Sequence, residues 1–269
     1  MKMTDFTSPK RVLHGMCVVA LSLVMLFGTT TGIKAEEADA RRILKAMSDY
    51  MAAQQAISFG FDATLEVVTL DTQKLGLASS GSLNLKRPGK IFFTRTGGFT
   101  DIELYFDGKM MTLLGKNLNI YTQLEVEGTL DHLIDELKNT YNQPLPAADL
   151  LLSNSYDELM LDVVDVKDLG TGVVGGVACD HLAFRTEDVD WQIWIAQGEQ
   201  PYPCRYVITS KLILGEPQYS VQIRDWQTGG SVAAAEYSFK NQTNAEKVDF
   251  KDIKGADDLP DHFTKGDSK

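Results

Sequence analysis

Apolar and polar residues alternate over residues 59–67. Apolar side chains take every second position, and polar ones lie between most of them: Phe59, Phe61, Ala63, Leu65 and Val67 against Asp62, Thr64 and Glu66. A repeat of two residues places these two sets on opposite faces of an extended strand. The pattern therefore predicts an antiparallel strand with one buried face and one solvated face.

Five short apolar runs follow, and turn-forming residues separate them. We expect strands over residues 81–86, 90–96, 101–106, 109–114 and 118–123. Asp107-Gly108 lies between two of these runs and is a strong hairpin signal, because both central positions of a type I′ turn require positive φ. The sequence thus predicts a meander of antiparallel strands.

Apolar residues recur at helical spacing in two longer segments. Residues 36–51 carry one apolar stripe, and their first turn is acidic, as the helix dipole favours. Residues 130–141 carry a second stripe behind a Thr129 cap, and Pro144 ends this segment. We expect two amphipathic helices that each bury one stripe.

The chain then changes character twice more. A short helix is expected over residues 146–152, and Ser155 with Glu158 has the spacing of a capping box for a further turn. From residue 163 to about residue 250 strands return, among them 176–186, 189–197 and 203–213. Residues 255–269 form a polar C-terminal tail.

The N-terminal segment has the layout of a secretory signal peptide. Lys10 and Arg11 precede an apolar run over residues 18–27, and small and polar residues follow as far as Ala35. The run is well short of the roughly 20 residues of a membrane-spanning helix, which disfavours a retained anchor. We expect cleavage after Ala35, a periplasmic location and a single domain over residues 36–254.

Acidic residues outnumber basic ones, 37 against 26, which gives a net charge of −11. Without residues 1–35 the balance is 36 acidic against 22 basic residues, or −14. Nucleic-acid binding depends on Lys and Arg that neutralise phosphates, so the charge argues against it. It also disfavours adhesion to anionic lipid headgroups. We expect no nucleic-acid partner, and lipid contacts of an apolar kind.

Two cysteines, Cys179 and Cys204, lie beyond the predicted signal segment. An oxidising compartment favours a disulfide between them. If their strands are the first and third of a simple meander, however, about 9.6 Å separates those strands, whereas a disulfide needs Cα atoms within about 7 Å. We favour two unbridged thiols, although sequence alone leaves the pairing open.

Motifs for catalysis and cofactors are weak. Residues 170–175 match the letters of a dinucleotide-binding glycine pattern, but the residues after them continue as a strand instead of opening a helix. A glycine-rich hairpin turn is the favoured interpretation. Cys179 and His181 would share a strand face as half of a zinc site, without a second pair. We therefore predict no catalytic residue, no metal, no cofactor and no enzymatic activity.

Two resemblances to known families exist. Residues 85–93, LKRPGKIFF, with residues 104–109, LYFDGK, resemble a motif of the periplasmic lipoprotein carrier and outer-membrane lipoprotein receptor (LolA/LolB-like) superfamily. Residues 179–185, 190–195, 206–210 and 217–219 resemble a family of predicted periplasmic proteins of unknown function, over most of residues 40–250. The first resemblance implies a half-open barrel whose internal helices hold acyl chains. The second implies no activity.

These observations predict an α+β fold: a strongly curved antiparallel sheet, or half-open β-barrel, of about 11 strands with helices on its concave side. Such a sheet can enclose more room than its side chains fill. We expect a non-enzymatic binding protein for a lipid or lipoprotein acyl chain. The predicted ligand-binding residues are Phe61, Leu65, Phe93, Leu104, Phe106, Trp191, Ile193 and Ile208.

Two other interpretations stay open. An envelope protein-interaction or assembly module would have a filled core and use its acidic surface or a sheet edge to meet a protein partner. A hydrolase would need a nucleophile and a base that converge in a cleft. A continuous apolar cavity in the interior would favour the binding protein over both.

Overall fold

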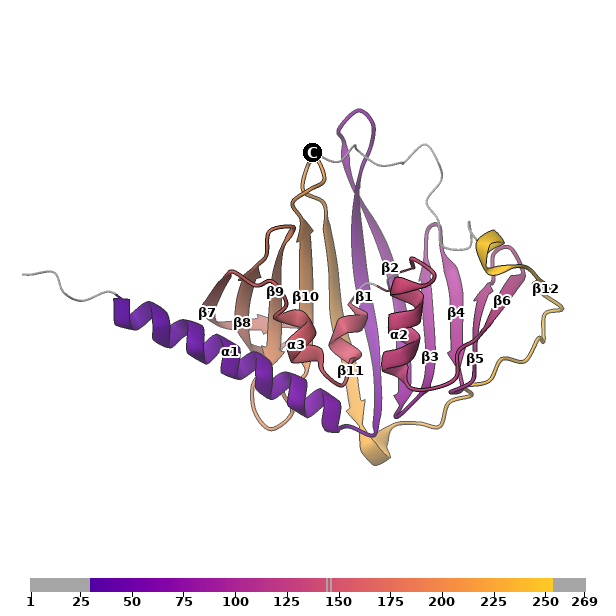
Figure 1. The fold of residues 1–269 in the computed structure, drawn as a ribbon, viewed down its shortest axis with the longest axis horizontal. Coiled ribbons are helices and arrows are strands. Elements are labelled where there is room, and N and C mark those ends of the chain that lie inside the picture. The colour runs from indigo at the N-terminus through magenta and orange to yellow at the C-terminus, as the bar shows by residue number, and fades with distance from the viewer. Residues whose placement is uncertain (1–29, 144, 146, 254–269) are drawn as a thin grey trace, which may run out of the picture.

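A computed structural model describes residues 30–143, 145 and 147–253 (Figure 1). The apolar core of the predicted signal segment and the predicted tail over residues 255–269 lie outside the described residues. The first helix, α1 (Thr30–Ala53), begins before the expected start at Glu36 and runs through the predicted cleavage point after Ala35. Glu37 and Asp39 therefore lie inside the helix, where they pair with Arg41 and Arg42.

One 12-stranded sheet forms the body of the protein (Figure 1). The strands are β1 (Ala56–Val68), β2 (Lys74–Lys86), β3 (Lys90–Gly97), β4 (Asp101–Phe106), β5 (Met110–Gly115), β6 (Ile120–Glu125), β7 (Asp165–Val174), β8 (Val177–Arg185), β9 (Val189–Ala196), β10 (Pro203–Ser210), β11 (Gln218–Thr228) and β12 (Glu246–Lys247). Their spatial order is β12-β6-β5-β4-β3-β2-β1-β11-β10-β9-β8-β7. Two antiparallel meanders are thus joined side by side through β1 and β11. The sheet is open, which confirms the predicted half-barrel.

The remaining helices lie on the same face of the sheet as α1 (Figure 1). They are α2 (Leu130–Asn139), the 3₁₀ turn η1 (Ala148–Leu151) and α3 (Ser155–Leu159). Two further 3₁₀ turns, η2 (Gly229–Ser231) and η3 (Phe250–Asp252), come after β11. In the view of Figure 1, α1 and α3 cover the β7–β11 half, and α2 covers strands of the other half.

The predicted apolar stripes are the faces that the helices bury. Ala40, Leu44, Met47 and Met51 of α1 are each at most 1% exposed, and α2 buries Leu130, Leu133, Ile134 and Leu137. Both stripes pack on the alternate apolar residues of the strands to form one core. Helix and strand periodicity therefore meet in a shared interior, as the sequence predicts.

Helix capping agrees with the sequence at α2 and differs at α3. The Thr129 hydroxyl accepts a hydrogen bond from the His132 backbone N–H at 3.2 Å, so the predicted cap of α2 is confirmed. The predicted capping box at α3 is wrong, because Ser155 is already the first helical residue and its hydroxyl makes no cap hydrogen bond. Glu158 instead accepts a hydrogen bond from the Asn154 side chain at 3.3 Å.

The hairpin at Asp107-Gly108 forms, but it is not a type I′ turn. Of these two residues only Gly108 has positive φ, +96°. The Asp107 carboxylate accepts hydrogen bonds from the backbone N–H groups of Lys109 and Met110, each at 3.0 Å. The side chain thus stabilises a three-residue loop between β4 and β5 in place of the tighter turn.

The glycine pattern at residues 170–175 lies in β7 and in the turn that follows it. Gly175 and Gly176 have φ values of +56° and +86° and connect β7 to β8 directly. A dinucleotide-binding loop would instead open a helix. The predicted glycine-rich hairpin is therefore confirmed.

Two stretches differ from the predicted strands. Strand β2 begins at Lys74 rather than at residue 81, because its first half pairs with β1. Small residues such as Gly76 and Ala78 hide this half in the sequence, since they do not alternate clearly with polar residues. Residues 232–245 contain no strand, contrary to expectation. We call this segment the strap: it leaves β11, runs below the sheet in Figure 1 and reaches β12 at the far edge.

The strap is held by side chains and not by a strand ladder. The Tyr237 hydroxyl donates to the Asn84 side chain at 2.7 Å, and the Ser238 hydroxyl donates to the Asp107 carboxylate at 3.1 Å. The Phe239 ring contacts the rings of Tyr105 and Tyr121 at centroid distances of 5.6 and 4.9 Å. These contacts explain why apolar residues here do not add a strand to the sheet.

Candidate functional site

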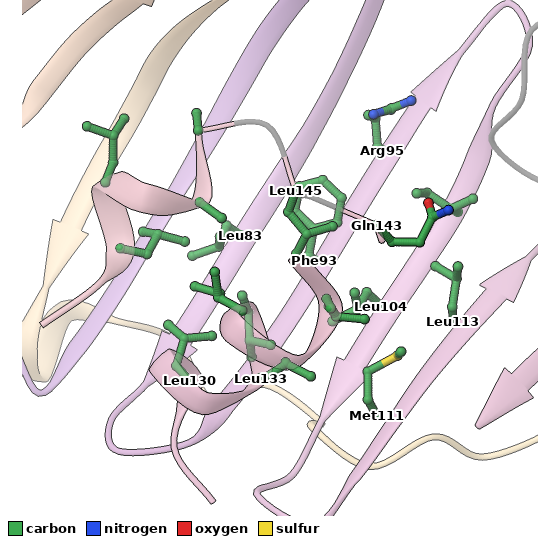
Figure 2. A pocket seen from close by; sticks show the side chains of 18 of the residues that line it. Leu83, Phe93, Arg95, Leu104, Met111, Leu113, Leu130, Leu133, Gln143 and Leu145 are labelled. Carbon is green, nitrogen blue, oxygen red and sulfur yellow. The ribbon is translucent and has the colours of Figure 1, made fainter. Parts of the chain in front are cut away.

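A cavity of about 590 Å³ lies between the first meander and the segment that contains α2 and η1 (Figure 2). Its volume is within the range of about 300–1,000 Å³ that is typical of small-molecule sites. The lining is mostly apolar and comes from strands, from α2 and from the loop after it: Phe59, Phe61, Leu83, Ile91, Phe93, Leu104, Met111, Leu113, Leu130, Leu133, Ile134, Leu137 and Leu145 among others.

Strand alternation creates the sheet side of this cavity. Phe61 of β1 and Phe93 of β3 stack across the intervening β2, with ring centroids 5.4 Å apart and an interplanar angle of 6°. The residue of β2 that pairs with Phe61 is Gly81. A Cβ atom at Gly81 would lie 2.5 Å from Phe61 Cζ, so the close approach of the ring requires glycine there.

Two hairpin turns hold the start of α2 over the cavity. The backbone N–H of Leu130 donates to the Pro88 carbonyl at 2.8 Å, and that of Gly128 donates to the Gly108 carbonyl at 3.0 Å. The turn after β2 and the loop after β4 therefore both contact the N-terminal end of the helix. The residues that carry the lipoprotein-carrier resemblance have this structural role here.

Arg87 links the same region to η1. Its Nη2 donates to the Leu151 carbonyl at 2.8 Å. Burial lowers the pKa of Arg87, and the charge of Asp131 opposes that shift. A residue at the end of β2 thereby positions the second helical element that lines the cavity.

The predicted ligand-binding residues fall into two groups. Phe61, Phe93 and Leu104 line the cavity. The other five lie elsewhere: Phe106, Trp191 and Ile193 in the filled core, Ile208 half-buried beside that core, and Leu65 at 39% exposure on β1. Ligand binding by any of the eight stays a prediction.

The filling of the second meander explains why Trp191 and Ile193 lie outside the cavity. Trp191 stacks on Phe184 with centroids 3.9 Å apart and meets the Tyr206 ring edge-on. Helix α1 packs against β7 and β9 and closes this half. Trp191 and Ile193 therefore belong to a packed core and not to the cavity lining.

Residues from α2 and from the loop after it were missing from the predicted site. Leu130 and Leu133 carried a signal, because their helical spacing already marked a buried stripe. Gln143 and Leu145 carried none, since a loop has no periodicity. Arg95 was also missed, although it follows Ile91 and Phe93 on alternate positions of one strand.

The candidate polar chemistry is dispersed. His181 Nε2 lies 3.0 Å from the Gln192 side-chain oxygen, and its ring stacks on Trp194 at 4.0 Å. Cys179 and Cys204 are both free and buried in a small separate cluster. Strand β9 lies between their strands, as the predicted meander requires. Within the described ranges, no three His, Cys, Asp or Glu side chains come together as a metal site.

Several solved structures show a partial likeness to this chain. The lipoprotein LppX from Mycobacterium tuberculosis is 13% identical, with 75% of this chain and 100% of LppX covered and a TM-score of 0.39. The MucA/MucB complex from Pseudomonas aeruginosa is 15% identical, with 74% of this chain and 59% of the matched chain covered and a TM-score of 0.42. A LolA superfamily protein from Nitrosomonas europaea is 10% identical, with 74% of this chain and 97% of that protein covered and a TM-score of 0.35. Likeness at this level carries no information about a ligand.

Comparison with curated proteins gives no match. In the part of the chain that the structure describes, none of the helices is long and apolar enough to span a membrane. One family profile, described as predicted periplasmic protein (DUF2092), matches residues 40–251. The resemblance found at residues 179–185, 190–195, 206–210 and 217–219 is thereby confirmed, and the chain belongs to this family of predicted periplasmic proteins.

Proposed function

We propose that this protein is a periplasmic, non-enzymatic binding protein that holds a lipid or a lipoprotein acyl chain in the cavity beneath α2. The observation that carries the proposal is the apolar cavity of about 590 Å³ between the sheet and α2. Ordinary protein interiors contain few voids larger than a water molecule. A space of this size and lining therefore supports an apolar occupant.

The energetics suit a hydrocarbon chain. Each methylene group transferred from water to an apolar environment contributes about 0.8 kcal/mol. The leucine and phenylalanine side chains that line the cavity offer no fixed charge to compete for water. In this proposal residues 36–254 form the binding domain, the segment before them directs export, and residues 255–269 form a tail.

The interpretation as an interaction module with a filled core has less support, because the first meander is not filled. A protein partner in the envelope fits the binding function as the donor or the acceptor of the ligand. We propose no catalytic step, since no nucleophile and base converge in the cavity lining that the structure describes.

The decisive experiment is lipid extraction combined with a plugging variant. Protein purified from the periplasm should release lipid into organic solvent, detected by mass spectrometry, and the extracted protein should bind a fluorescent apolar dye. Leu145, 39% exposed, lines the cavity in Figure 2. Leu145→Trp should obstruct the cavity and weaken dye binding at least fivefold.

Leu118→Trp is the matched control, because Leu118 is 51% exposed in the turn before β6 and does not line the cavity. It should bind dye as the unmodified protein does. Absence of both extractable lipid and dye binding would reject the proposed function.

A further inference from the structure

The cavity beneath α2 is closed at one end. Figure 2 shows Met111, Leu130 and Leu133 at this end, and all three side chains are at most 2% exposed. The start of α2 is hydrogen bonded there to the turn after β2 and to the loop after β4. A Cβ atom at Gly89 would lie 2.3 Å from the Gly128 carbonyl oxygen, so the two backbones are in close contact. These contacts seal the cavity below the helix.

The opposite end of the cavity is open. Gln143 lies at this end in Figure 2. The loop after α2 lines the cavity with Asn142, Gln143 and Leu145, and all three are exposed. The two amide side chains can make hydrogen bonds to a polar group that remains outside. An amphiphile can therefore enter with its hydrocarbon chain first and keep its head in water.

The second half of the sheet offers a further chain no alternative place. Trp191 and Phe184 stack there, and α1 packs on the same strands. The turn η1 packs against α1 and α3, and its Leu150 and Leu151 line the cavity at 3% and 8% exposure. The interior of the second meander is filled, so a second chain would have to share the cavity beneath α2.

The volume of the cavity fits one hydrocarbon chain. A methylene group is roughly as large as a water molecule, which takes up about 30 Å³ of the liquid. The cavity of about 590 Å³ therefore has room for about 20 such groups. One chain of about 16 to 18 carbon atoms fits into this space, whereas two such chains exceed it.

We propose that the ligand is an amphiphile with a single acyl chain, a fatty acid or a lysophospholipid, whose chain enters first and ends against Met111 and Leu133. This proposal rests on the proposed function and adds the number, the length and the direction of the chains. A lipid with two or three long chains cannot place all of them in the cavity. The polar head lies near Asn142 and Gln143.

The first test varies the length of the chain. The protein is purified from the periplasm, delipidated and loaded with the apolar dye, which saturated fatty acids from decanoate to docosanoate then displace. We expect the affinity to rise about fourfold with each added methylene group, as its transfer from water to an apolar environment predicts. The rise should stop at about 16 to 18 carbon atoms, where the chain reaches the closed end.

The second test varies the number of chains at a constant headgroup. Hexadecanoyl lysophosphatidylcholine and dihexadecanoyl phosphatidylcholine are each incubated with the delipidated protein, and native mass spectrometry measures the complexes. We expect one lysophospholipid per protein molecule and at least tenfold less complex with the two-chain lipid. The affinities for hexadecanoate and for the lysophospholipid then show which of the two heads the open end prefers.

Variants at the closed end test the direction of the chain. Met111→Ala should move the length limit up by about two carbon atoms, because alanine lacks the Cγ, Sδ and Cε atoms of methionine. Met110→Ala is the matched control, since Met110 lies on the opposite face of β5 and does not line the cavity. If Met111→Ala does not fold, Met111→Phe replaces it and should move the limit to shorter chains.

The outcomes separate this inference from the proposed function. Binding of the two-chain lipid as tightly as the lysophospholipid, or an affinity that still rises beyond about 20 carbon atoms, would overturn the single chain and leave lipid binding in place. An equal length limit in the Met111 and Met110 variants would overturn the direction of entry. Failure of every amphiphile and of the dye would overturn the proposed function as well.

Discussion

Gly81 is the residue on which the aromatic side of the cavity depends. An added Cβ would lie 1.9 Å from the Thr94 carbonyl oxygen and 2.5 Å from Phe61 Cζ. The backbone oxygen cannot move without disturbing the pairing of β2 and β3. Gly81→Ala should therefore destabilise the protein by about 1–3 kcal/mol, the usual cost of overpacking.

Urea unfolding of Gly81→Ala, followed by circular dichroism, measures this effect. Gly98→Ala is the control, because a Cβ at Gly98 meets nothing within 4 Å. Its free energy of unfolding should stay within about 0.5 kcal/mol of the unmodified protein. Equal stability of both variants would contradict the close approach of the Phe61 ring.

Asp149 gives the protein a pH-dependent stability. Burial raises the pKa of Asp149, although hydrogen bonds from the Leu150 N–H and the Tyr206 hydroxyl act in the opposite direction. Its pKa is higher in the folded than in the unfolded state, so its contribution to stability is complete below about pH 3.9. That contribution is lost as the pH rises through the folded pKa.

Asp149→Asn mimics the protonated acid at every pH. Relative to the unmodified protein, this variant should therefore gain more stability at pH 7 than at pH 3 in urea unfolding experiments. Asp157→Asn, on the exposed side of α3, should show no such difference. A difference between the two pH values that is equal for both variants would contradict the role of Asp149.

At the level of single residues, the sequence predicts on which face of a strand a side chain lies better than it predicts what packs around that side chain. Alternation along β1, β3 and β4 correctly predicted that Phe61, Phe93 and Leu104 lie on the sheet face that the helices cover. The same rule applied to Trp191 and Ile193, yet α1 packs against their strand, β9, and other core side chains fill the space around them. Whether an inward residue meets a cavity or a helix depends on long-range packing, which a period of two residues does not encode.

Among the elements, α2 is the one whose stability bears most directly on the cavity. Its N-terminal cap is the hydrogen bond from the His132 N–H to the Thr129 hydroxyl. Thr129→Ala should cost about 1 kcal/mol of unfolding free energy, as is typical for loss of an N-cap. It should also weaken binding of the apolar dye, because the helix supplies four cavity-lining residues.

Thr129→Ser is the matched control, since it keeps the hydroxyl group and should retain nearly all of the stability. Both quantities, urea midpoint and dye affinity, are measured on each variant. Similar losses in the serine and alanine variants would show that the cap does not hold α2 in place.

Element prediction succeeded where local and tertiary preferences agree. The stripes of α1 and α2 and the meanders follow from periods of 3.6 and 2 residues. The first half of β2 was not predicted, because small residues such as Gly76 and Ala78 do not make one strand face clearly more apolar than the other. Pairing with β1 supplies its hydrogen bonds. The local sequence of the strap is typical of a strand. Contacts of the Tyr237 and Phe239 side chains instead hold it against other strands without backbone pairing.

For the whole molecule, the order of helices and strands and the resemblance to the lipoprotein-carrier superfamily together predicted the fold class. The two halves of the sheet nevertheless differ in how their inner face is covered. Helices α1 and α3 pack over the second meander, and a cavity remains between the first meander and α2. Sequence did not reveal this asymmetry, because both halves carry similar apolar faces. It follows from the long α1 crossing toward β7, at the far edge from β6.

The two ends of this open sheet have different forms of protection against unwanted pairing. At one edge the strap delivers β12, whose two residues cover part of β6. At the other, β7 is interrupted by a bulge between Asp168 and Thr171, with Gly170 at φ +78°. Bulges and very short edge strands discourage edge-to-edge aggregation. With both edges protected in this way, the open sheet should resist strand pairing with further copies of the same chain.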